Sequence, residues 1–157
     1  MYEKSDRQNR NAAGPAAGPQ QNQGMQDLLG YIRGDKKDEY EIFSLEGLIK
    51  TKFAGKTESD TKMSQLRKFY DDVVTLDQDL SYSDSEIKTR LARIIPLARY
   101  SNARGNLDDT LMKLIDDAIK LISHETDPKK GREMLSRFRR IMEAIVAYKK
   151  EKRREGY

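Results

Sequence analysis

The chain has 157 residues, enough for one domain of ordinary size with some length left for a tail. It contains no cysteine, which excludes disulfides, thiolate metal sites and cysteine nucleophiles and favours a cytoplasmic location. Its net charge of +4 is unevenly distributed along the chain. Residues 1–61 carry nine Lys and Arg against ten Asp and Glu, whereas residues 62–157 carry 21 against 16. Such a surplus fits a polyanionic partner, and it equally fits a solvated surface of mixed charge.

The N-terminal part has the composition of a disordered tail. Residues 1 to about 26, which include "NAAGPAAGPQQNQG", have almost no large apolar side chain to offset the entropy of ordering. No apolar run approaches the ~20 residues that span a bilayer, and the first residues lack the apolar region of a signal peptide, so secretion and membrane insertion are disfavoured. We therefore predict a disordered tail over 1–40 and a helical domain over 41–157, with a short helix near 41–53.

After Thr61 the apolar residues follow helical periodicity. The first predicted helix has one apolar face, formed by Leu66, Phe69, Tyr70, Val73, Leu76 and Leu80. A second helix starts at Ser83, where Glu86 completes the spacing of a capping box, and runs towards a stop at Gly105.

Two further helices follow, and no segment has the alternation of a strand. Asn106 is the predicted N-cap of the third helix, with Asp108 and Asp109 in its first turn. The fourth begins with Asp127 as cap and Pro128 at the first helical position. The sequence thus predicts an all-α fold, a compact bundle of about four to six helices, four of them principal.

Pro96 interrupts the pattern of the second helix. Within a helix it removes one backbone hydrogen bond and costs ~3 kcal/mol unless the helix bends. The alternative is that one helix ends near Ile95 and another starts at Pro96. Both alternatives predict a corner in the chain at this point.

Candidate catalytic groups are few. His124, which is the only histidine, stands at the end of an amphipathic helix, where a C-terminal cap or a surface position is favoured over a zinc ligand. Asp109 and Asp116 are seven residues apart and share a helix face, as two ligands of a nuclease metal site would. Helix-start chemistry already explains Asp109, so we predict no catalytic residue, no metal and no cofactor.

Basic residues form stripes on two of the predicted helices. On an ideal helix three arginines, a leucine and a tyrosine lie in a row, namely Arg90, Arg93, Leu97, Tyr100 and Arg104. On the last helix Arg132, Arg139 and Lys150 lie within about 20° of one another, while Arg137 and Arg140 lie elsewhere on the polar face. Arginine suits phosphate oxygens and tyrosine can stack on an unpaired base, so these stripes favour single-stranded nucleic acid. Local ion pairing and a solvated helix face remain the alternative for each single arginine.

Three segments in order resemble one family: "SQLRKFYDDV" (64–73), "IIPLARYSNAR" (94–104) and "EAIVAYKK" (143–150). They are similar to the small subunit of the type III-A CRISPR effector, the Csm complex, over residues 62–150. The resemblance implies a non-enzymatic, all-helical subunit in antiviral defence. Several copies would stack as a filament along the crRNA-bearing backbone subunits, beside other effector subunits, and would hold single-stranded target RNA through its backbone without sequence specificity.

The resemblance also carries residues over. Arg67 and Lys68 match a basic pair of the first motif and Arg104 matches the basic residue that closes the second, while Tyr100 and Tyr148 match aromatic positions for which packing is favoured. Leu97 stands where the family tends to have a lysine, and Arg99 is a candidate to supply that charge. The predicted RNA-contact set is Arg67, Lys68, Arg90, Arg93, Arg99, Arg104, Arg132, Arg139 and Arg140. The alternative function is a helical adaptor for acidic protein partners with no RNA role.

Overall fold

The computed structural model describes residues 19–35, 38–54 and 61–155, and in these ranges it contains helices and no strand. The all-α prediction is confirmed. The elements in chain order are α2 (Pro19–Arg33), α3 (Glu39–Phe43), the π-helix η2 (Ile49–Ala54), α4 (Met63–Gln78), α5 (Asp84–Ala103), α6 (Asp109–His124) and α7 (Pro128–Glu155). The four principal helices of the prediction are α4 to α7.

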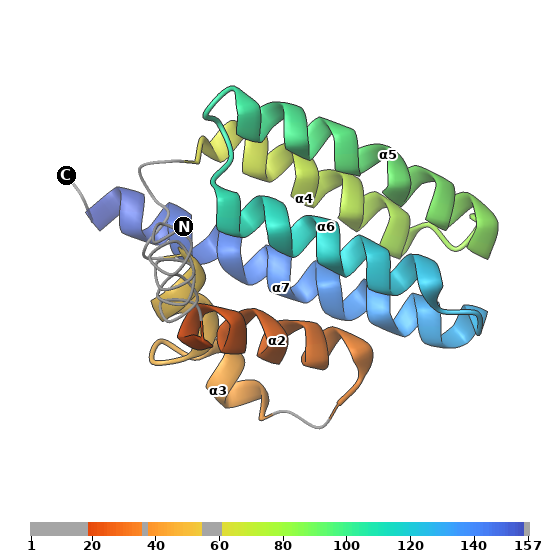
Figure 1. The fold of residues 1–157 in the computed structure, drawn as a ribbon, viewed down its shortest axis with the longest axis horizontal. Coiled ribbons are helices and arrows are strands. Elements are labelled where there is room, and N and C mark those ends of the chain that lie inside the picture. The colour runs from red at the N-terminus through yellow and green to blue at the C-terminus, as the bar shows by residue number, and fades with distance from the viewer. Residues whose placement is uncertain (1–18, 36–37, 55–60, 156–157) are drawn as a thin grey trace, which may run out of the picture.

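These helices pack around α7. Figure 1 shows α4 and α5 on one side of the α6–α7 pair and α2 with α3 on the other side. The last helix packs against α2, η2, α4, α5 and α6, so it is the common partner of the bundle. It supplies the apolar stripe that the others cover, namely Met134, Leu135, Phe138, Ile141, Met142, Ile145 and Val146. Among the described residues no helix combines the length and the apolar character that crossing a bilayer requires.

The helix ends agree with the predicted caps at two of three places. Ser83 accepts a hydrogen bond from the Glu86 amide at 3.1 Å, and the Glu86 carboxylate accepts one from the Ser83 amide at 3.4 Å, which completes the capping box. The Asp127 side chain accepts from the Lys129 amide at 3.0 Å, just before α7. The N-cap of α6 is Asp108 instead of Asn106, because Asp108 Oδ1 accepts from the Leu111 amide at 2.7 Å while Leu107 is buried ahead of it.

The prediction of a disordered tail over 1–40 was wrong for α2. Residues 19–33 form a helix whose apolar face is buried against α6 and α7, with Leu28 and Ile32 fully covered. The segment is polar overall, which favoured the prediction of disorder, but its few apolar residues fall on a single helix face. The tail predicted over residues 1–18 lies outside the described residues.

Between α2 and α4 the chain forms two short elements instead of one helix over 41–53. Asp38 caps α3 by accepting from the Tyr40 amide at 2.9 Å, and the helix ends after Phe43. The chain turns at Gly47, where an added Cβ would lie 2.6 Å from the carbonyl oxygen of Glu41, and continues as η2. Gly47 therefore allows a close approach that any other residue would prevent.

Pro96 does not break the second helix. A single helix runs from Asp84 to Ala103 with Pro96 inside it, so the alternative of a helix end near Ile95 was wrong. The ring faces solvent while Leu91, Ile94 and Ala98 are buried, so the lost backbone hydrogen bond lies on the outer side of the helix. The first helix also differs from its prediction, because it ends at Gln78 and leaves Leu80 exposed in the following loop.

The capping box of α5 contributes measurably to the stability of the protein. We expect Ser83→Ala to lower the free energy of unfolding by about 1 kcal/mol, because the Glu86 amide loses its partner at the helix start. Urea unfolding monitored by circular dichroism measures this change. Ser85→Ala, an exposed serine two residues further on, is the matched control and should change stability by less than about 0.5 kcal/mol. Equal effects of the two variants would contradict the assignment of the cap.

Candidate nucleic-acid interface

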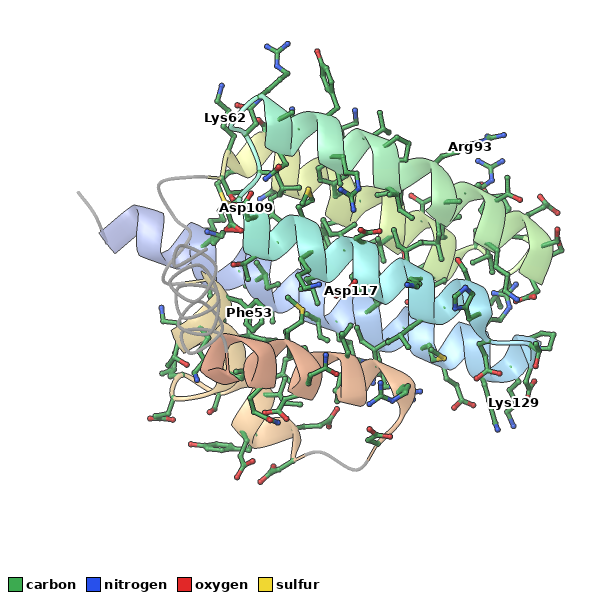
Figure 2. The ribbon with its side chains drawn as sticks, in the orientation of Figure 1. Phe53, Lys62, Arg93, Asp109, Asp117 and Lys129 are labelled. Carbon is green, nitrogen blue, oxygen red and sulfur yellow. The ribbon has the colours of Figure 1, made fainter. Side chains whose placement is uncertain are left out.

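Six of the nine predicted contact residues are exposed on the hairpin of α4 and α5. The two helices are antiparallel, since Gln65 near the start of α4 accepts a hydrogen bond from Ser101 near the end of α5 at 3.3 Å. The exposed members are Arg67, Lys68, Arg90, Arg93, Arg99 and Arg104. Figure 2 shows Arg93 on the outer side of α5, pointing away from the bundle. The hairpin therefore presents positive charge to solvent.

A groove of about 220 Å³ lies along this hairpin. Its lining combines basic, acidic, aromatic and apolar side chains from both helices and from the loop between them: Asp72, Thr75, Leu76, Tyr82, Arg90, Arg93, Ile94 and Leu97. The predicted row of Arg90, Arg93 and Leu97 thus shares one surface. The continuity of α5 through Pro96 explains why this part of the row keeps its alignment.

Inside the groove Arg90 lies over an aromatic ring. Its guanidinium carbon is 4.6 Å from the centre of the Tyr82 ring, which is the geometry of a cation–π contact. Across the groove, burial raises the pKa of Asp72, and the neighbouring charge of Lys68 opposes that shift. The groove therefore holds a stacked cation beside a carboxylate that is partly removed from water.

The C-terminal end of the α5 row is a second exposed pair. Arg104 donates to the hydroxyl of Tyr100 at 3.0 Å, and its guanidinium carbon is 5.6 Å from the Tyr100 ring centre. Tyr100 is 61% exposed, so the expectation that it packs in the core was wrong. Tyr148 does pack, because it is partly buried and its hydroxyl donates to the carbonyl of Phe43.

Arg67 and Lys68 do not share one surface of α4. Consecutive residues project about 100° apart on a helix. Lys68 lies one turn before Asp72, on the side of α4 that borders the groove. Arg67 lies one turn before Asp71 and is exposed on the outer side of the helix. The basic pair of the first motif therefore points in two directions.

Arg99 and the other three predicted contact residues, Arg132, Arg139 and Arg140, connect elements of the fold. Arg99 pairs with Asp116 of α6 at 2.5 Å, and Arg132 donates to the carbonyl of Tyr82. Arg139 pairs with Asp77 of α4 at 2.6 Å and with Glu143 at 3.5 Å. Interaction with the Tyr31 hydroxyl of α2 raises the pKa of Arg140. Each of these cations already has a partner within the protein.

The acidic residues considered for a metal site have other partners. Asp116 pairs with Arg99, and Asp109 accepts a hydrogen bond from the Asn102 amide group at 2.8 Å. Over the ranges 19–35, 38–54 and 61–155, no three His, Cys, Asp or Glu side chains are grouped so that they could hold a metal ion. His124 is the last residue of α6 and is exposed.

Sequence reasoning did not identify Tyr82 as part of the interface. Its position in the loop "DLSYS" (79–83) between α4 and α5 gave no periodic signal, because side-chain direction in a loop cannot be obtained from a helical wheel. Its signal was compositional, since it is the one aromatic residue of this five-residue loop.

The comparisons with known proteins identify the family. The model of the family Csm2 Type III-A matches residues 46–155, which include η2 and all of α4 to α7. No curated protein and no solved structure matches the chain. The matched region covers more than half of the chain and agrees with the resemblance of the three motifs. The chain therefore belongs to the Csm2 Type III-A family, whose members are structural small subunits of the type III-A CRISPR effector complex.

Proposed function

We propose that this chain is a non-catalytic subunit that stacks in several copies along the crRNA-bearing backbone subunits and holds target RNA without sequence specificity. It would act in the cytoplasm, in antiviral defence. The observation that carries the proposal is the exposed basic surface of the α4–α5 hairpin, which includes Lys68 of α4, Arg93 of α5 and Arg104 at the end of α5. Cations of this kind bind the phosphates of a strand and leave its bases unread.

Salt dependence tests the proposal. The full chain is titrated with fluorescent single-stranded RNAs of unrelated sequences at several salt concentrations, and binding is measured by anisotropy. We expect similar affinity for the unrelated sequences. For the variant Lys68→Ala, Arg93→Ala, Arg104→Ala, the slope of log affinity against log salt should fall by about 2, because each single-strand phosphate contact contributes about 0.7.

The matched control removes the same charge elsewhere. Lys120, Lys129 and Lys130 are exposed on α6 and at the start of α7, so their joint replacement by alanine should leave the slope close to that of the unchanged chain. Equal losses in both triple variants would show a dependence on net charge alone and would contradict a defined surface. Absence of RNA binding together with normal assembly into the complex would favour the protein adaptor instead.

A further inference from the structure

The groove between α4 and α5 has features that phosphate binding does not require. An exposed row of cations would suffice for a strand backbone, yet this surface is hollowed by about 220 Å³. Its lining includes three apolar side chains, Leu76, Ile94 and Leu97. Leu97 is 45% exposed, so part of this apolar lining is open to solvent. An apolar hollow inside a basic surface fits a ligand that has both a charged and an apolar part.

One side of the groove is formed by a cation–π contact. Tyr82 is partly buried against the core, which holds its ring in place, and the Arg90 guanidinium lies over the ring at 4.6 Å. Arg90 is exposed. A guanidinium that already lies on an aromatic ring offers a flat, weakly hydrated surface on which a further planar group can stack.

The charges of the groove favour one orientation of such a ligand. Arg93 stands at the exposed rim, whereas Asp72 is half-buried in the lining. A phosphate is attracted to the rim and repelled by the carboxylate further in. A nucleobase carries N–H groups on its edge that a carboxylate can accept. The phosphate would therefore stay outside while the base enters.

The size of the groove limits what enters. Pockets that bury a drug-sized ligand have volumes of ~300–1,000 Å³, so a groove of about 220 Å³ accommodates a single base or a single side chain. The lining contains two cations, Arg90 and Arg93, against one carboxylate, Asp72, which favours a polyanionic strand over a polypeptide. We infer that the α4–α5 groove holds one unstacked base of a bound single-stranded RNA, with Tyr82 and Arg90 as its stacking wall.

This inference rests on the proposed function, and the experiment separates the two. The full chain is titrated with two single-stranded RNAs of equal length and charge, one intact and one with abasic sites along its central stretch. Phosphate contacts are the same for both RNAs, so their affinity ratio reports only what the bases contribute. We expect the intact RNA to bind about tenfold more tightly, as base stacking on an aromatic side chain would give.

Tyr82→Leu should bring this ratio close to one. The substitution removes the ring and keeps the backbone carbonyl that accepts from Arg132. Tyr40→Leu makes the same change at a tyrosine of α3 that is 69% exposed, far along the chain from the groove, and should leave the ratio unchanged. Leu97→Ala, at an exposed position, should lower the ratio without affecting folding, which keeps the test valid if Tyr82→Leu proves unstable.

The outcomes distinguish the claims. Salt-dependent binding with equal affinity for both RNAs would overturn the base site and leave the proposed function in place. Absence of salt-dependent binding would overturn both. Retention of the tenfold ratio in both Tyr82→Leu and Leu97→Ala would also overturn the base site. If Tyr82→Leu and Leu97→Ala keep the ratio of RNA affinities but no longer assemble into the effector complex, the groove is a contact for a protein side chain.

Discussion

Replacing Leu28 by alanine should lower the free energy of unfolding of the full chain by about 2–5 kcal/mol. The Leu28 side chain is 0% exposed, and its truncation leaves a cavity between α2 and the α6–α7 pair that the neighbouring helices can fill only in part. Chemical denaturation measures the change. The prediction tests whether α2 is part of the folded core, although α2 lies outside the region that the family model matches.

The control for this experiment is Gln26→Ala, an exposed residue of the same helix. Its replacement keeps the helix and removes no buried contact, so stability should change by less than about 0.5 kcal/mol. Hydrogen bonds also fix α2, because Arg137 Nε donates to the carbonyl of Ile32 at 3.0 Å and the Tyr31 hydroxyl donates to Glu39 at 2.9 Å. A Leu28→Ala variant as stable as Gln26→Ala would mean that α2 does not stay packed in solution.

Replacing Asp77 by alanine should cost about 2–3 kcal/mol of stability. Its carboxylate, whose side chain is 11% exposed, accepts from the Ser136 hydroxyl at 2.5 Å and from Arg139 Nε at 2.6 Å, so it ties α4 to α7. Hydrogen bonds to a charged group contribute more than neutral ones, and their loss leaves the Arg139 cation, 21% exposed, with Glu143 alone. Thermal and urea unfolding would both report the loss.

Asp71→Ala supplies the comparison for Asp77. Asp71 lies on the same helix but is exposed, so its removal should change stability by less than about 0.5 kcal/mol. If Asp77→Ala costs no more than Asp71→Ala, the contact between Asp77 and Arg139 contributes nothing net. A double-mutant cycle with Arg139→Met would then show no coupling energy between the two positions.

Periodicity and capping chemistry were sufficient to predict the four principal helices. The buried positions of α4 and α6, such as Phe69 and Leu114, follow from the 3.6-residue period alone. Prediction failed where tertiary contacts decide the local structure. The segment that forms α2 contains polar residues such as Gln23 and Gln26. Its helix is stabilised by the packing of Leu28 and Ile32 against α6 and α7, which the local sequence does not reveal.

The candidate interface was predictable only in part for a related reason. A helical wheel aligned Arg90, Arg93 and Leu97 correctly, because all three lie on one helix. It could not assign partners on other helices, so Arg99 and Arg139 were included although Asp116 and Asp77 pair with them in the structure. The contribution of Tyr82 and Asp72 to a shared groove depends on how α4 and α5 pack, which a single sequence does not encode in any local pattern.

The central position of α7 has a consequence for how the protein folds during synthesis. This helix packs against α2, η2, α4, α5 and α6, and it follows all of them in the chain. Until it leaves the ribosome, the parts of the earlier helices that α7 covers stay open to water, although α5 with α6 and α2 with α6 can already pack against each other. Closure then joins segments far apart in sequence, such as Phe43 with Tyr148, and contacts of this kind slow folding. The synthesis and packing of α7 is therefore also the step at which the nascent chain passes from an aggregation-prone state to a folded one.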